Sequence, residues 1–468
     1  MSAEDFHLYS ARQLIQGLAS GQWSSETLTR HFLDRIARLN PELHAVHSLN
    51  PQALQQAREI DERRRQGVAL GPLAGLPMTL KDAFTCRGLR TTFGTALYAW
   101  NRPGKDCRVI AALRAADPVF LGRSAVPTAS FDWNCRNQVF PECVNPLDPE
   151  RTPGGSSGGA AAALAAGITP LELGSDVAGS IRYPAHCCGV YGLRTTDGWL
   201  PISDVGPDRK HGFQNLVVCG PMARHLDDLS LITELFAKKF PDPRLKPQAQ
   251  TKSAQDLRMA FSFELVGLAP DPESRALMQN WLEKLQQRGV QLSEAAPDLD
   301  FAGLNADWGL ILGYELAHSL PGFLPVSLRK QLMDLMVLKR LGPGWMRPGV
   351  LEGMSLKKPD YLAALARYRS TQNQSDRFFK AYDAWVLPTS PSAAIRRAEC
   401  GSTLQTHLGP IPYVDYLGGY LCSTTMMGTP ALAIPIGRTA AGLPIGLQVH
   451  GARFADLALL AQMKQLLA

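Results

Sequence analysis

Residues 152–185 read TPGGSSGGAAAALAAGITPLELGSDVAGSIRYPA, and the interpretation of the whole chain depends on this stretch. Two clusters rich in glycine and serine, 154–159 and 174–180, enclose an alanine-rich segment, 160–167. Glycine permits left-handed backbone and close approach of a ligand, and alanine has the highest helix propensity. We therefore predict a buried helix that starts at the first cluster and ends at Gly167, with both clusters facing one pocket.

Two simpler interpretations of the first cluster have to be weighed. The hexapeptide GGSSGG alone is typical of a flexible linker. Here, however, an apolar helix and a second ordered turn follow it, rather than a domain boundary. A phosphate-binding loop is a second interpretation, but the chain lacks the Gly-Lys-Ser/Thr ending that such a loop requires. Both alternatives are therefore less favoured than a catalytic pocket.

An apolar run upstream ends in a lysine, in the phrase GLPMTLKD at residues 75–82. A lysine at the end of an apolar strand points into the interior or into a cleft, where loss of hydration lowers its pKa and makes the neutral amine available as a base. Such a lysine more often reaches solvent. Only its combination with the serine clusters makes Lys81 a catalytic candidate.

Together, these motifs resemble the amidase signature family of serine hydrolases, which uses a Ser–Ser–Lys triad. The resemblance rests on GGSSGG, on GSDxxGSIRxPA, on GxPxxxKD, and on the 24 positions that separate Ser156 from Ser180. It covers nearly the whole chain and is weakest between about 240 and 380. It implies an α/β fold in which helices cover both faces of a central twisted mixed β-sheet.

The resemblance assigns the catalytic roles to Lys81, Ser156 and Ser180. Ser180 attacks the amide carbonyl. Ser156, preceded by an unusual peptide bond that its glycine neighbours allow, passes the proton of the nucleophile to neutral Lys81 and later gives one to the leaving amine. Water then hydrolyses the acyl-enzyme. Hydrolysis of an amide needs this nucleophile, this proton transfer and donors for the oxyanion.

The family resemblance also implies an oxyanion hole made of backbone N–H groups, those of Val177, Ala178, Gly179 and Ser180. The family often has Thr-Gly-Gly at positions 177–179. Ala178 restricts the backbone more than glycine does, but it contributes the same N–H group.

Three further side chains are expected to support the site. We expect Ser157 to anchor the glycine-rich loop by hydrogen bonding, and the resemblance implies that Asp176 and Arg182 brace the turn. An ordinary helix cap or a surface ion pair is the alternative for each. Near the expected pocket the chain departs from the family pattern at Ala125, Thr128, Phe140-Pro141 and Thr425, which affects the expected substrate class rather than the triad.

We expect one amidase domain over residues 1–468. Its parts are N-terminal helices (1–66), a signature core (72–236), a variable substrate-pocket region (240–380) and a C-terminal part that closes the site (381–468). Leu8 is expected to open the apolar face of the first helix. The Met-rich segment 332–338 is interpreted as core packing ahead of substrate contact.

Composition excludes several functional classes. A net charge of +6 on 468 residues gives little reason to expect nucleic-acid binding. No signal segment and no apolar run of about 18 residues appear, so we expect no membrane association and a cytoplasmic location. Nine cysteines occur without a CxxC pair or a metal-binding Cys/His spacing, so we expect no metal and no cofactor.

We predict an amidase that hydrolyses a small, uncharged carboxylic amide to carboxylate plus ammonia or amine. Neutral residues at 177–178 and the apolar content of 300–350 favour an aryl or alkyl acyl group. One alternative is the glutaminase component of a tRNA-dependent amidotransferase, an enzyme of the same family that depends on partner proteins. Another is a non-catalytic binding protein on the same fold. The sequence permits a homodimer but does not fix the oligomeric state.

Overall fold

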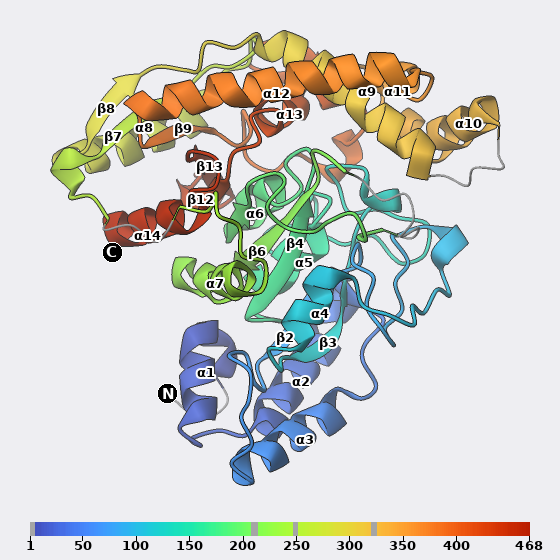
Figure 1. The fold of residues 1–468 in the computed structure, drawn as a ribbon, viewed down its shortest axis with the longest axis vertical. Helices are drawn as coiled ribbons and strands as arrows, with labels where there is room; N and C mark the ends of the chain where they lie inside the picture. Colours follow the sequence, from blue (N-terminus) through green and yellow to red (C-terminus); the bar gives the residue numbers. More distant parts are fainter. Residues whose placement is uncertain (1–4, 207–213, 247–250, 320–324) are drawn as a thin grey trace.

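An eight-stranded mixed sheet runs through the middle of the molecule (Figure 1). The computed structural model describes residues 5–206, 214–246, 251–319 and 325–468. In spatial order the strands are β4 (Leu171–Asp176), β6 (Val218–Ala223), β5 (Tyr191–Arg194), β12 (Ala431–Arg438), β13 (Pro444–His450), β9 (Ala384–Pro388), β7 (Arg258–Phe261) and β8 (Gln291–Glu294). Neighbours from β4 to β9 are antiparallel, and β9, β7 and β8 are parallel to one another.

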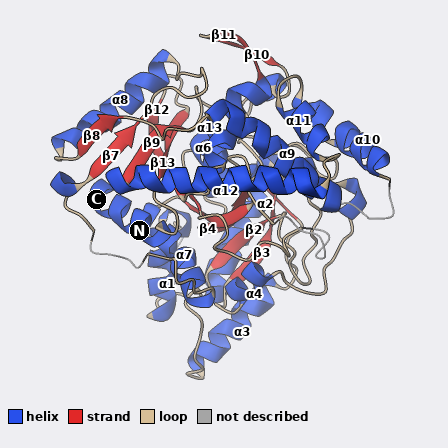
Figure 2. Ribbon diagram, turned by 45° about the horizontal axis from the view of Figure 1, so that its top comes forward, coloured by secondary structure: helices blue, strands red, loops and turns tan. Residues whose placement is uncertain are grey.

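A three-stranded sheet adjoins the large one at β4. It has the order β1 (Val46–His47), β3 (Val119–Ser124), β2 (Pro77–Lys81), and β2 runs parallel to β3. Beside β4, the N–H of Thr79 donates to Thr169 Oγ1 over 3.1 Å. This placement brings the end of β2 to the end of β4. A separate hairpin, β10 (Thr403–Thr406) with β11 (Gly409–Pro412), extends from the body at the top of Figure 2.

Helices cover both faces of the large sheet, because side chains along each strand alternate between two cores. In β9, Val386 packs into one core and the neighbouring Trp385 into the other. The first core includes α7 (Leu229–Lys239), α8 (Pro272–Gln287) and α14 (Asp456–Leu467). The second includes α6 (Arg182–Cys188), α9 (Phe301–Ser319), α12 (Lys358–Ala381) and α13 (Tyr413–Thr425). The predicted fold, a mixed sheet with helices on both faces, is confirmed.

The N-terminal part is helical, as predicted, and its helices α2 and α3 pack below the small sheet in Figure 1. Its helices are α1 (Ala11–Ala19), α2 (Ser25–Leu43) and α3 (Ala53–Arg65). A further helix, α4 (Arg108–Arg114), follows β2 and belongs to the predicted signature core. Ser10 and Gln13 form a capping box at α1, and the Ser24 hydroxyl caps α2. The first helix therefore starts after Leu8, which lies in a 3₁₀ turn with 58% of its surface exposed. The assignment of Leu8 to the buried helix face was wrong.

The alanine-rich segment forms α5 (Gly158–Ala165), which is buried along almost its whole length. Gly167 follows it with φ +66°, in keeping with the predicted helix end. The predicted turn 174–180 is shorter than expected, because residues 174–176 complete β4 and pair with β6. The chain turns only at 177–180 before it enters α6.

The variable region contributes α9, α10 (Val326–Met336), α11 (Met346–Gly353) and the long α12, which crosses the top of Figure 1. In the Met-rich segment, Met333 and Leu338 are buried, whereas Leu335 is exposed. Among the described residues, no helix combines the length and apolar character needed to span a bilayer. The short 3₁₀ turns are η1 (Phe6–Leu8), η2 (Ala96–Tyr98), η3 (Thr128–Ser130), η4 (Leu226–Asp228), η5 (Ala254–Asp256), η6 (Leu338–Leu341) and η7 (Arg397–Glu399).

Candidate active site

Three segments that are distant in sequence meet where β2 and β4 end. Strand β2 ends at Lys81, the loop before α5 carries Ser156, and the turn after β4 carries Ser180. Lys81 is fully buried, and Ser156 and Ser180 are 2% and 5% exposed. The Ser157 N–H donates to the Ser180 carbonyl over 3.1 Å, so a backbone hydrogen bond joins the loop to the turn. The structure thus brings the three residues predicted as the triad into one buried region.

The Lys81 amine lies within hydrogen-bond distance of three oxygen atoms. These are Ser156 Oγ at 2.7 Å, Ser175 Oγ at 2.9 Å and Ser175 O at 3.2 Å. Burial lowers the pKa of Lys81 to about 7, although the nearby Asp176 charge opposes this shift. The Ser175 carbonyl can only accept, so it takes one amine N–H. A neutral amine then has a lone pair free to accept the Ser156 hydroxyl proton.

The loop that carries Ser156 lies very close to a neighbouring segment. The Gly155–Ser156 peptide bond is cis, and this is the unusual bond that the resemblance implied. A Cβ atom at Gly155 would clash with the Asn134 carbonyl oxygen, so only glycine fits there. Ser157 anchors the loop through its N–H, and its hydroxyl lies 3.4 Å from the Ser175 carbonyl oxygen.

Residues 177–180 form a turn with several backbone amides free of intramolecular partners. The Gly179 N–H donates to Asp176 Oδ1 over 2.8 Å, and Gly179 has φ +87°. Within the described part of the chain, the amides of Val177, Ala178 and Ser180 have no hydrogen-bond partner. Of the four N–H groups predicted for the oxyanion hole, these three are therefore available to a ligand.

A buried ion pair supports this turn from below. Arg182 Nη2 lies 3.0 Å from Asp176 Oδ1, and both side chains are fully buried. Burial alone would raise the pKa of Asp176, but Arg182 and Arg194 together hold it below its usual value. Arg182 also donates to Thr424 Oγ1, Thr425 Oγ1 and Gln448 Oε1 at 2.7–2.9 Å. Thr425, one of the positions at which the chain departs from the family pattern, thus takes part in the network.

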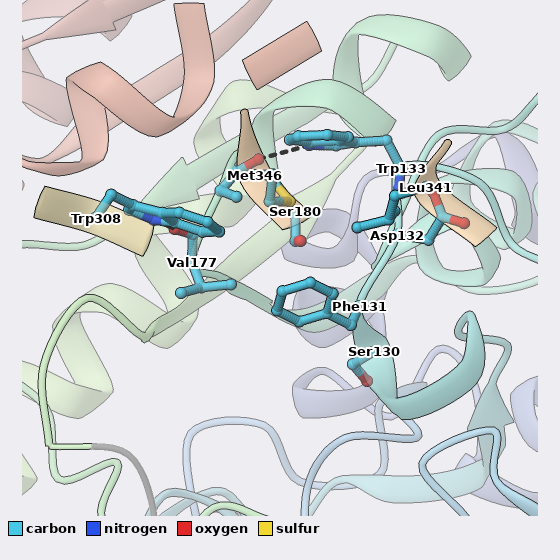
Figure 3. A pocket seen from close by; sticks show the side chains of 10 residues that line it. Ser130, Phe131, Asp132, Trp133, Val177, Ser180, Trp308, Leu341 and Met346 are labelled. Atoms are coloured by element: carbon cyan, nitrogen blue, oxygen red, sulfur yellow. Dashed lines mark hydrogen bonds between the residues drawn. The ribbon is translucent and has the colours of Figure 1, made fainter. Parts of the chain in front are cut away.

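Ser180 opens onto a small, mostly apolar cavity of about 20 Å³, which has room for about one water molecule (Figure 3). Its lining residues are Ser130, Phe131, Asp132, Trp133, Val177, Ala178, Ser180, Trp308, Leu341 and Met346. No Lys, Arg or His is among these described lining residues. The cavity therefore offers aromatic and aliphatic surface and no cationic side chain.

One carboxyl group, that of Asp132, lies in the wall of the cavity. Its oxygens accept from the Trp133 N–H at 2.7 Å, from Asn134 Nδ2 at 2.8 Å and from the Tyr413 hydroxyl at 2.8 Å. Burial raises the pKa of Asp132 to about 6, against the effect of these donors. Much of its accepting capacity is thus used within the protein.

Comparison with known proteins bears directly on this site. The model of the Amidase family matches residues 27–460. The chain belongs to the amidase family. Among curated relatives, the A subunit of the glutamyl-tRNA(Gln) amidotransferase of Moorella thermoacetica is 32% identical to this amidase, over 97% of this chain and 95% of that one. The protein of the same name from Thermobifida fusca is 31% identical, over 96% and 93%. Family membership makes the chain an enzyme that cleaves amide C–N bonds.

Solved structures show that the fold of this amidase is shared across the family. A bacterial aryl acylamidase of the amidase signature family superposes with a TM-score of 0.82 at 23% identity, covering 98% of this chain and 96% of that one. A peptide amidase from Stenotrophomonas maltophilia superposes with a TM-score of 0.76 at 23% identity, covering 98% and 96%. The mixed sheet with its helical layers is therefore common to these proteins and to this chain.

Sequence reasoning missed three residues of this amidase site. Ser175 contacts Lys81 through two oxygens, and its place beside Asp176 in the motif was the only available signal. The indole N–H of Trp133 donates to the Ala178 carbonyl over 2.6 Å, and that of Trp308 donates to the Val177 carbonyl over 2.9 Å. Both tryptophans come from segments without a motif, so no local pattern marked them.

Proposed function

We propose that this protein is an amidase that hydrolyses a small, uncharged carboxylic amide to carboxylate plus ammonia or amine. The observation that carries the proposal is the contact of 2.7 Å between buried Lys81 and Ser156, beside an apolar cavity that Ser180 lines. A buried lysine with a pKa of about 7 can act as a base near neutral pH. This complete set of contacts also speaks against a non-catalytic binding protein.

In the proposed reaction, the Ser180 oxygen attacks the amide carbonyl carbon and its proton passes to Ser156, whose own proton passes to Lys81. The oxyanion that forms accepts from the free amides of the 177–180 turn. The C–N bond then breaks as Ser156 gives the nitrogen a proton and recovers one from Lys81. Water, activated by the same relay, attacks the acyl-enzyme and releases the carboxylate.

The cavity lining supports an uncharged acyl group. Phe131, Trp133, Trp308, Leu341 and Met346 supply most of the wall, and burial of an aryl or alkyl chain against them is favourable. A negatively charged substrate group would lose its hydration there without gaining a cationic partner. The cavity as it stands is small, so binding of an acyl chain requires these side chains to move apart.

A second candidate function rests on the relatives named above. The curated proteins at about 31% identity carry the name of the A subunit of glutamyl-tRNA(Gln) amidotransferase, so this chain could release ammonia from glutamine inside a complex. Glutamine carries a free carboxylate, however, and the described cavity lining offers that group no cation. We therefore place this function second.

A panel of substrates separates the two functions. Purified protein is mixed with neutral aryl and alkyl amides and with glutamine, and release of ammonia or amine is measured, with Ser180→Ala as the inactive control. We expect turnover of one or more neutral amides without a partner protein. Turnover of glutamine alone, or only after addition of other amidotransferase components, would overturn the proposed substrate class.

A further inference from the structure

Two indole N–H groups hold consecutive carbonyls of the 177–180 turn. Trp308, on α9, donates to the Val177 carbonyl over 2.9 Å, and Trp133, on the loop before α5, donates to the Ala178 carbonyl over 2.6 Å. Both side chains are buried, with exposed fractions of 1% and 3%. Figure 3 shows the two indoles reaching the turn beside Ser180.

Each bond fixes the direction of an amide as well as of a carbonyl. The peptide unit is planar, and in a trans unit the C=O and the following N–H point in opposite directions. The bond from Trp308 therefore fixes the Ala178 N–H on the side away from its indole. The bond from Trp133 likewise fixes the Gly179 N–H, which is the amide that Asp176 accepts at 2.8 Å.

For the Ala178 amide, the other contacts of the turn leave this orientation to Trp308. The Ala178 N–H has no partner in the described part of the chain, so no bond of its own fixes its direction. An oxyanion donor works by being oriented before the charge develops. A carbonyl tied to a buried, tightly packed indole provides such an orientation, since the indole itself cannot easily turn.

We propose that Trp308 and Trp133 are positioning residues for amide hydrolysis: Trp308 orients the Ala178 amide toward the oxyanion, and Trp133 fixes the next peptide of the turn, whose Gly179 N–H donates to Asp176. This inference rests on the proposed function. Both rings also line the cavity at Ser180, so the wall that contacts the acyl group is the same structure that orients the donors. A substrate that fits between the two rings leaves the amides of the 177–180 turn correctly oriented. A substrate that displaces the rings also displaces these amides.

The test replaces the N–H while keeping the ring. β-(3-Benzothienyl)alanine has the bicyclic shape of tryptophan with sulfur in place of the N–H, and it is incorporated at position 308 or at 133. Trp345 is the matched control. Its ring packs edge-on against that of Trp308, with 5.7 Å between the ring centroids. Among the described residues, however, its indole N–H donates no hydrogen bond to the turn. Three quantities are measured: kcat and KM for a neutral amide, and the rate constant for phosphonylation of Ser180 by an alkyl fluorophosphonate.

At 308 and at 133 we expect kcat to fall by about 10-fold or more with KM changed less than about 3-fold, since removal of a whole oxyanion donor lowers kcat by about 100- to 1000-fold. The phosphonylation rate should fall in parallel, because the phosphonyl oxygen uses the same amides. The analogue at 345 should leave both unchanged. A purely structural role would lower the melting temperature and leave kcat and phosphonylation of the folded enzyme intact, which would overturn the inference.

The phosphonylation rate also separates failure of the inference from failure of the proposed function. If wild type turns over the neutral amide and is labelled on Ser180, and the 308 and 133 variants are labelled equally fast, the positioning role is wrong and the proposed function stands. If wild-type Ser180 is not labelled at all, the proposed function fails and the inference fails with it. A larger loss at 345 than at 308 would likewise contradict the assignment.

Discussion

The Lys81 Nζ atom lies 2.7 Å from the Ser156 Oγ atom, and neither residue exposes more than 2% of its surface. Burial favours the neutral amine of Lys81 over the ammonium ion, because the ammonium ion would lose its hydration there. The same burial that makes Lys81 a base near neutral pH therefore opposes folding at that pH. Stability and activity respond in opposite directions to a change at this residue.

Substitution of Lys81 by methionine should abolish hydrolysis and stabilise the fold at neutral pH. The folded-state pKa of about 7 lies below the ordinary lysine value of 10.5, so between these values the unfolded chain binds the proton and the folded chain does not. The free energy of unfolding of wild type therefore rises with pH across this window. We expect Lys81→Met to gain about 2–4 kcal/mol at pH 7 and much less near pH 10, measured by urea unfolding. An equal gain at both pH values would contradict the assigned pKa.

The rate of hydrolysis should depend on pH through the same group. Because only neutral Lys81 can accept the proton, kcat/KM should rise from about pH 5.5 through about 7 and level off above about pH 8. Burial also raises the pKa of Asp132 to about 6 and that of Glu172 to about 7. Asp132→Asn and Glu172→Gln are therefore the controls, and the rise must persist in both. A profile that is flat over this range, or a rise lost in either control, removes Lys81 as the base.

The ion pair beneath the turn should be essential to the fold. Asp176→Asn leaves Arg182 and Arg194 buried without their carboxylate, and loss of one partner from a buried pair typically costs about 3–5 kcal/mol. It also weakens the bond that holds the Gly179 amide. The melting temperature and kcat should both fall, as measured by thermal unfolding and by amide hydrolysis.

A surface pair provides the control for Asp176. Asp242 binds Arg244 over 2.7 Å, but the Arg244 side chain is 57% exposed, so this bond is screened by water. Asp242→Asn should match wild type in melting temperature and in kcat. If Asp176→Asn proves as stable as Asp242→Asn, the buried network is not what supports the turn.

Gly179 should be irreplaceable for activity as well as for backbone conformation. It has φ +87°, and a Cβ atom there would lie 2.6 Å from the Leu421 side chain. Gly442 has a similar φ of +81° with no atom within 4 Å of a built Cβ, far from the site in sequence. Gly→Ala at either position should lose about 1–2 kcal/mol from the left-handed backbone. Only Gly179→Ala should lose hydrolysis, measured as kcat on the folded protein; equal activity of the two variants would contradict the account.

The elements that could be predicted from the sequence are those that depend on local sequence pattern. The apolar run that ends at Lys81 forms β2, and the alanine-rich segment forms buried α5. The motifs around Lys81, Ser156 and Ser180, and the 24 positions between the two serines, were enough to predict that the three residues form one site.

What could not be predicted depends on long-range packing. Trp308 lies on α9, a helix with no motif, and reaches the turn across 131 positions of sequence. Trp133 lies in an irregular loop, where no periodicity marks a buried face. The boundary of the second cluster was also misplaced. Residues such as Gly174 favour a turn locally, but pairing with β6 holds them in a strand.

The measurement that tests the central claim most directly is mass mapping of the protein after reaction with an alkyl fluorophosphonate. Wild type is compared with Ser180→Ala and Lys81→Met. A single phosphonyl adduct on Ser180 in wild type, none in Ser180→Ala and much slower labelling in Lys81→Met are the predicted results. An adduct on another residue, or labelling of Ser180 at an unchanged rate without Lys81, would contradict the account.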